Sequence, residues 1–286
     1  MSAHAAWAAA VDTDLPRSSA LLALPALLFT GVLFIVPLVL MLSRAFTDPA
    51  PGLSNLEWMA TTPVVAKIVW ATLRFSLAAS VISVALGYLL AYVIVFAGGR
   101  TGALLLAVLL ISFWLSVLVR CFALILMLRP NGPVKAALDS FGLHTVQLIR
   151  NEPGVLIGMT HYLIPFAALT ALPVLRGIDR AVIGAARSMG ASRLRVFRTI
   201  TLPLSAPGIV AALGLCFVIA LGFYITPALL GGGRVVMIAE FITFYVQNVL
   251  AWGKAAALAI FLLVVIASVF FIARLGSVAL RRKVIA

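Results

Sequence analysis

Six long stretches without a charged side chain restrict the fold of this sequence more than any other feature. They lie between Arg17 and Arg44, Arg74 and Arg100, Arg100 and Arg120, Glu152 and Arg176, Arg198 and Arg234, and Lys254 and Arg274. A helix needs about 20 mainly apolar residues to cross a bilayer. The sequence therefore predicts an all-α integral membrane protein with six transmembrane helices, at 21–42, 72–96, 103–127, 154–175, 207–230 and 256–274.

The composition agrees with a membrane protein. Hydrophobic residues make up 64% of the 286 residues, charged residues 10%, and the mean hydropathy is +1.20, which excludes an ordinary soluble domain. The first stretch is too long for a signal-peptide core and lacks a basic leader, so we expect it to be retained. We divide the chain into a tail (1–19), a first helix with its outer loop (20–70), a core (71–275) with a cytoplasmic loop at 176–206, and a basic tail (276–286).

The distribution of charge predicts the orientation. With the N-terminus inside, twelve of the 21 basic residues are cytoplasmic, against three acids (Asp12, Asp14 and Asp179), and the other five acids lie outside. Basic cytoplasmic loops are typical of membrane proteins. The net charge of +13 thus needs no nucleic-acid partner, and we expect both termini to be cytoplasmic in a multi-pass protein.

Several functional classes lack their sequence signals. Cys121 and Cys216 show no metal-ligand spacing, so we expect no metal site. Proton- or sodium-coupled transporters use intramembrane carboxylates, and the six predicted spans contain none. No H-E-x-x-H, G-x-S-x-G or carboxylate pair indicates a membrane enzyme. Composition alone does not separate a permease from a channel.

The loop at 176–206 carries the strongest local pattern. We predict a short helix from Asp179 to Met189, a left-handed turn at Gly190, and a second helix from Arg193 to Thr201 that Ser192 caps. We expect Pro203 and Pro207 to turn the chain back toward the membrane. The product is a helical elbow just below the bilayer.

This loop resembles the EAA loop of binding-protein-dependent ABC import permeases, which reads E-A-A, three residues, G, nine residues, I-x-L-P. Gly184 stands where the family usually has Glu, and the matching positions are Ala185, Ala186, Gly190, Ile200, Leu202 and Pro203. An ordinary basic loop lying on anionic lipid is the alternative.

The resemblance implies a type I ABC importer permease fold, with a five-helix core and a peripheral first helix, in a bacterial plasma (inner) membrane. It implies a transport subunit that pairs with a second permease, identical or homologous, and works with two ATP-binding subunits and an external solute-binding protein. The loop would couple to the ATPase through Ala185, Ala186, Gly190, Ala191, Ser192, Phe197, Ile200, Leu202 and Pro203. No stretch reads G-x-x-x-x-G-K-[ST], so we expect no cofactor on this chain and ATP with Mg on the partner.

Candidate residues for the solute path are Arg120, His161, Phe223, Tyr224, Thr226 and Glu240. Arg120 either snorkels to the outer interface or takes part in a gate. His161 either bonds a neighbouring helix or contacts solute. Pro227 frees a backbone carbonyl near Phe223, and such a broken turn must be buried or wet. Glu240 either meets a cation or the binding protein, or is a solvated loop charge.

Strings such as 128–132 and 224–232 resemble the polyamine branch of these permeases. Gly222 stands where the polyamine members often carry an acid. Aromatic faces attract ammonium groups, and Phe223, Tyr224, Phe241, Phe244, Tyr245 and Trp252 supply them. We therefore expect a small organic cation or zwitterion, such as a polyamine or amino-acid derivative.

Overall fold

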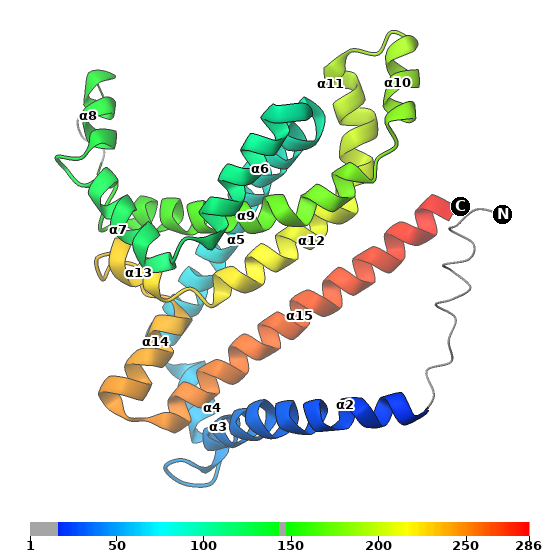
Figure 1. Cartoon of the computed structure of the whole chain (residues 1–286). Coiled ribbons are helices and arrows are strands. Elements are labelled where there is room, and N and C mark those ends of the chain that lie inside the picture. The colour runs from blue at the N-terminus through cyan, green and yellow to red at the C-terminus, as the bar shows by residue number, and fades with distance from the viewer. Residues whose placement is uncertain (1–16, 143–146, 286) are drawn as a thin grey trace.

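The described part of the chain is helical. The computed structural model describes residues 17–142 and 147–285, and within these ranges it contains helices and no strand (Figure 1). Most of the N-terminal tail, 1–16, lies outside the described residues. Six described stretches are long and apolar enough to cross a membrane: Leu24–Thr47, Pro63–Ala97, Val117–Ser140, Glu152–Arg176, Arg193–Leu221 and Trp252–Phe271. The all-α fold with six membrane helices is thereby confirmed.

The first membrane helix is peripheral. Helix α2 (Arg17–Thr30), a π-helical turn (Gly31–Ile35) and α3 (Val36–Thr47) follow one another without a break. The apolar side chains from Leu24 to Leu40 are exposed, as a lipid-facing helix requires. Only its last part, α3, packs on α15 (Trp252–Ile285), and the helix lies along the edge of the molecule (Figure 1).

Three helices form the centre of the core. Helix α5 (Pro63–Ala97) packs most extensively on α9 (Glu152–Arg176), and α12 (Leu202–Leu221) packs on both. Small side chains permit close approach between membrane helices. The small buried residues include Ala79, Ser83, Gly87 and Ala91 on α5, Ala167, Ala168 and Ala171 on α9, and Gly208, Ala212, Cys216 and Ala220 on α12.

The third predicted span is divided, so the expectation of one helix at 103–127 is wrong. Helix α6 (Gly99–Trp114) and α7 (Val117–Leu128) are separated by Leu115 and Ser116, which have extended backbone with ψ of 135° and 142°. Hydropathy does not register this break because the residues on both sides are apolar. A buried arginine stabilises the break, as the functional site shows.

The helix that leaves the loop also differs from expectation. We expected Pro203 and Pro207 to turn the chain, but α11 (Arg193–Val196), a π turn (Phe197–Thr201) and α12 form one helical stretch of 29 residues, Arg193–Leu221. The π turn replaces the i to i−4 bonds of the α-helix locally, and the stretch stays helical through Pro203, which follows the turn directly at the start of α12. The chain breaks later, at 222–224, before α13 (Ile225–Leu230).

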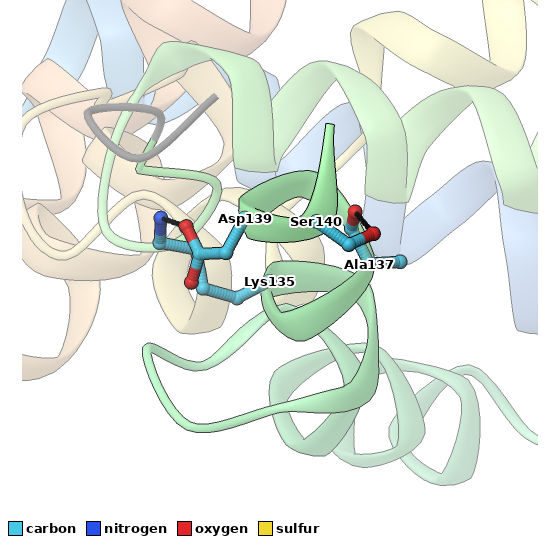
Figure 2. Close-up of polar contacts among 4 residues, drawn as sticks. All are labelled: Lys135, Ala137, Asp139 and Ser140. Carbon is cyan, nitrogen blue, oxygen red and sulfur yellow. Dashed lines mark hydrogen bonds and ion pairs between the residues drawn. The ribbon is translucent and has the colours of Figure 1, made fainter. Parts of the chain in front are cut away.

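Short helices occupy three of the segments that connect the longer helices. They are α4 (Ser54–Thr61), α8 (Pro133–Ser140) and α14 (Ile238–Phe244), the last followed by a π turn (Tyr245–Val249). Figure 2 shows how α8 is held internally: Lys135 pairs with Asp139 one turn on, and the Ser140 hydroxyl donates to the Ala137 carbonyl at 2.6 Å.

The closest approach of α5 to α9 lies at Gly87. A Cβ added there would stand 2.7 Å from the Ala167 Cβ and 2.8 Å from the Ile164 carbonyl oxygen. One of these contacts is backbone, so the two helices would have to move apart. By contrast, a Cβ at Gly214 in α12 would meet nothing within 4 Å.

We therefore predict that Gly87→Ala lowers the thermal stability of the purified protein relative to Gly214→Ala. Overpacking costs about 1 to 3 kcal/mol, whereas the gain in helix propensity, about 1 kcal/mol, is shared by both variants. Unfolding in detergent, followed by tryptophan fluorescence, measures the difference. Equal midpoints for the two variants would contradict the close α5–α9 contact.

Candidate functional site

The loop between α9 and α12 begins with a capped helix. Helix α10 (Arg180–Ser188) starts after Asp179, whose carboxylate accepts a hydrogen bond from the Ala181 backbone N–H at 2.8 Å. This is the helix that the sequence placed at 179–189. It projects beyond the ends of α9 and α12 (Figure 1).

Gly190 ends α10 in a left-handed conformation, with φ of +83°. The Gly190 N–H donates to the Arg187 carbonyl at 3.0 Å, and the Ala191 N–H donates to the Ala186 carbonyl at 3.1 Å. This pair of bonds is a Schellman motif. A Cβ at Gly190 would meet nothing within 4 Å, so the backbone angle alone favours glycine here.

The second arm of the elbow begins at once. The Ser192 hydroxyl accepts a hydrogen bond from the Arg195 N–H at 3.3 Å, as a helix N-cap. Ala186 on the first arm and Val196 on the second are buried, and α10 packs on α11. We call this unit, residues 179–201, the elbow.

Aromatic packing ties the elbow to the membrane core. The Phe197 ring lies 5.2 Å from that of Tyr92 and 6.2 Å from that of Tyr88, between ring centroids. The Tyr88 hydroxyl and the Ser205 hydroxyl are buried and 2.6 Å apart. Because Tyr88 and Tyr92 belong to α5 and Ser205 to α12, these contacts join the elbow to two core helices.

The predicted coupling residues divide into exposed and inward-facing groups. Ala185, Gly190, Ser192, Leu202 and Pro203 are exposed, Ala191, Phe197 and Ile200 are half-buried, and Ala186 is buried. The most exposed apolar side chains of the elbow are Met189, 82% exposed, and Leu194, 57% exposed. Sequence reasoning did not single out Met189, because a methionine beside Gly190 carries no pattern of its own.

Arg120 lies at the break between α6 and α7. Its side chain is only 4% exposed, so within this chain it does not snorkel. The Arg120 Nη2 donates to the carbonyl oxygens of Ser112 and Phe113, the latter at 3.0 Å. The break deprives these carbonyls of their usual helical partners, so a cation at the negative end of α6 satisfies them.

Tyr162 of α9 gathers several predicted path residues around it. The Arg120 guanidinium carbon lies 5.0 Å from the centre of the Tyr162 ring, and the Phe223 ring packs edge-on at 5.3 Å. The Cys121 sulfur, next to Arg120, lies 3.7 Å from the Thr226 hydroxyl. We call Arg120, Cys121, Tyr162, Phe223 and Thr226 the Tyr162 cluster. Tyr162 and Cys121 were missed, because neither stands out in an apolar span until the fold brings distant helices together.

The other predicted path residues lie apart from these contacts. His161 is exposed on the surface of the single chain, within electrostatic reach of Arg120. Tyr224 is 41% exposed at the start of α13. Glu240, in the first turn of α14, is half-buried rather than solvated. Burial raises the pKa of the Glu240 carboxyl above its usual range, and its Oε2 has no hydrogen-bond partner among the described residues.

The rings of Trp58, Tyr245 and Trp252 lie against cationic side chains of the same chain. The Lys254 ammonium lies 4.9 Å from the centre of the Trp58 ring and 5.8 Å from that of Tyr245. The Arg44 guanidinium faces the Trp252 ring at 5.7 Å. These faces are therefore less available to a solute than the sequence suggested. In the described part of the chain, no group of three or more His, Cys, Asp or Glu side chains could hold a metal.

Relatives in sequence are import permeases. Residues 83–282 match the family described as "Binding-protein-dependent transport system inner membrane component". The chain is 29% identical over 224 residues to the spermidine/putrescine transport system permease protein PotB of Haemophilus influenzae, covering 78% of each protein. It is 28% identical to PotB of Escherichia coli, covering 78% of this chain and 82% of that protein. A probable molybdenum ABC transporter permease protein of Haloferax volcanii is 30% identical over 198 residues, covering 68% of this chain and 69% of that protein.

Solved structures share the fold. A chain of a bacterial ABC transporter that imports the acidic polysaccharide alginate matches with a TM-score of 0.71 and 20% identity, over 91% of this chain and 97% of that chain. A chain of the MetNI methionine ABC transporter, in an inward facing conformation, matches with a TM-score of 0.58 and 18% identity, over 77% of this chain and 98% of that chain. Since the family match spans most of the sequence, this chain belongs to the binding-protein-dependent inner membrane components, the permease subunits of ATP-driven importers whose ATPase is a separate subunit.

Proposed function

We propose that this permease imports a small organic cation or zwitterion and that its elbow receives the movement of the ATPase. The observation that carries the proposal is the construction of the elbow: a Schellman turn with Met189 at its exposed tip and Phe197 packed inward on α5. An exposed apolar tip on a rigid base is suited to docking in a partner's cleft.

The helix that leaves the elbow supplies a mechanical path. The stretch from Arg193 to Leu221 is one helix of 29 residues, about 44 Å long at about 1.5 Å per residue. It runs from the elbow to the break at 222–224, where Phe223 belongs to the Tyr162 cluster. A rotation of the elbow would therefore be carried to the candidate solute path as a rigid-body movement.

The partners follow from the family. Two ATP-binding subunits, each holding ATP and Mg, would clamp the elbows of this chain and of a second permease, identical or homologous. An external binding protein would deliver the solute; one solved relative is an alginate transporter in complex with a substrate-bound periplasmic protein. The basic elbow favours an orientation with the elbow and both termini cytoplasmic.

We predict that Gly190→Val abolishes most uptake while the protein still inserts and assembles. An L-residue in the left-handed conformation costs roughly 1 to 2 kcal/mol, and β-branched valine suffers more than asparagine, which such turns accept. Gly190→Asn is therefore the matched control and should retain most uptake.

Uptake by whole cells and the amount of assembled transporter in the membrane are measured together. At equal assembly, we expect Gly190→Val to fall at least tenfold below Gly190→Asn. Normal uptake by the valine variant would rule out the elbow as the coupling element.

Several observations favour a cation or zwitterion. The relatives include the spermidine/putrescine permeases, and half-buried Glu240 has a carboxylate oxygen without a described partner. Arg120 near the path, and Gly222 where an acid is common in the polyamine branch, disfavour a polyamine with several positive charges. A monocation or a zwitterion therefore ranks above spermidine.

We predict that the partner binding protein, titrated calorimetrically, binds a monocationic amine or a zwitterionic amino-acid derivative more tightly than spermidine. In the permease, Glu240→Gln should raise the KM for uptake of that solute, because a carboxylate attracts an ammonium group and an amide does not. Exposed Glu57 on α4 provides the matched control, Glu57→Gln. Strong binding only of an anion such as molybdate, sulfate or a sugar acid would refute this solute class.

A further inference from the structure

A cavity of about 360 Å³ opens where four helices meet on the elbow side of the molecule. Its lining comes from the last turn of α5, the turn at Gly98 and Gly99, the first turns of α6, the end of α9 and the start of α10. Its lining includes no residue of the Tyr162 cluster or of the candidate solute path, and it does not include Met189 at the tip of the elbow.

Two arginines give the cavity its charge. Arg176 and Arg180 line it, and none of its lining residues is acidic. Arg180 donates one hydrogen bond to the Val95 carbonyl, at 3.2 Å, which leaves most of its guanidinium N–H groups for another acceptor. Asp179 lies between the two arginines in sequence, but its carboxylate is engaged by the Ala181 N–H.

The N-terminus of α6 lies at the same cavity. Gly98 and Gly99, both with positive φ, line the cavity where α6 begins. No side chain caps that helix, so its first N–H groups have no side-chain acceptor. They add a partial positive charge to that of the two arginines.

The remaining walls are apolar. Apolar side chains of the lining include Ile94 and Phe96 of α5, Ala103 and Leu106 of α6 and Leu175 of α9. A cavity lined by two arginines and by apolar side chains, at the ends of membrane helices, matches a lipid better than a fully hydrated ion. Basic pockets between membrane helices at the interface are typical sites for anionic lipid headgroups.

We propose that this cavity binds the phosphate group of an anionic phospholipid, held by Arg176 and Arg180, with its glycerol and upper acyl chain against α5 and α6. The lipid joins the α5–α6 turn to the base of the elbow. Free phosphate would offer the same oxygen acceptors to the two arginines. Only a lipid also has an acyl chain that contacts the apolar residues of the lining.

The test uses the complete transporter, purified with its ATPase and partner permease and stripped of lipid by detergent washing. It is titrated with phosphatidylglycerol, with phosphatidylcholine of the same acyl chains, and with inorganic phosphate, and native mass spectrometry and thermal unfolding follow binding. We expect a tight phosphatidylglycerol site that Arg176→Gln weakens at least tenfold, since charge-assisted bonds to phosphate are strong. Arg100→Gln is the matched control, because Arg100 is exposed at the same turn and does not line the cavity.

A second variant guards against a purely structural effect of the arginines. Ala103→Phe places a bulky side chain on the apolar wall and removes no charge. It should lower phosphatidylglycerol binding without changing the unfolding midpoint in lipid-free detergent. Three results would each overturn the proposal. Arg100→Gln could lose as much phosphatidylglycerol binding as Arg176→Gln, or neither Arg176→Gln nor Ala103→Phe could lose any. Inorganic phosphate or phosphatidylcholine could stabilise the transporter as much as phosphatidylglycerol does.

Discussion

Every backbone N–H and carbonyl group within a bilayer must find a partner inside the protein, because lipid offers none. Continuous helices meet this constraint over most of the chain. The two interruptions, at 115–116 and 222–224, need other partners. At the first, the Arg120 Nη2 donates to the carbonyls of Ser112 and Phe113, which compensates for part of the cost of burying this side chain, while its Nε and Nη1 have no hydrogen-bond partner among the described residues. At the second, backbone bonds from Gly222 to Ile219 and from Phe223 to Ala220 tighten the end of α12.

The two interruptions lie close to each other in the fold, because α7 packs on α13. Cys121, beside Arg120, contacts Thr226 beyond the second break, and Tyr162 of the unbroken helix α9 packs between Arg120 and Phe223. A second core cluster, which includes Tyr88 and Ala91 of α5, extends to the elbow through Phe197, whose ring meets Tyr92 on α5. The elbow and the Tyr162 cluster thus rest on two neighbouring core clusters, both of which contact Ile209 of α12.

The sequence alone predicted the features that follow from long apolar stretches or from a single characteristic residue. Hydropathy located the membrane helices, and Gly190 and Ser192 gave the turn and cap of the elbow. It missed the break before Arg120, because apolar residues continue through it. It also missed that the helix continues from α11 through the π turn and Pro203 into α12. It also missed Tyr162, because its contacts are with Arg120, 42 positions earlier in the sequence, and with Phe223, 61 positions later. The aromatic cluster near Trp252 was assigned to solute, although the chain's own Lys254 and Arg44 face those rings.

The central claim is that the elbow faces the ATPase on the cytoplasmic side while the opposite ends of the helices face outward. Cysteine accessibility in intact cells tests it most directly, because both native cysteines, Cys121 and Cys216, are buried. Exposed Asn131 and Arg234 stand beside Gly132 and Gly232 in the outer segments. An impermeant thiol reagent added outside should label Asn131→Cys and Arg234→Cys, and should label Met189→Cys only in inside-out vesicles. Labelling of Met189→Cys from outside in intact cells would contradict the account.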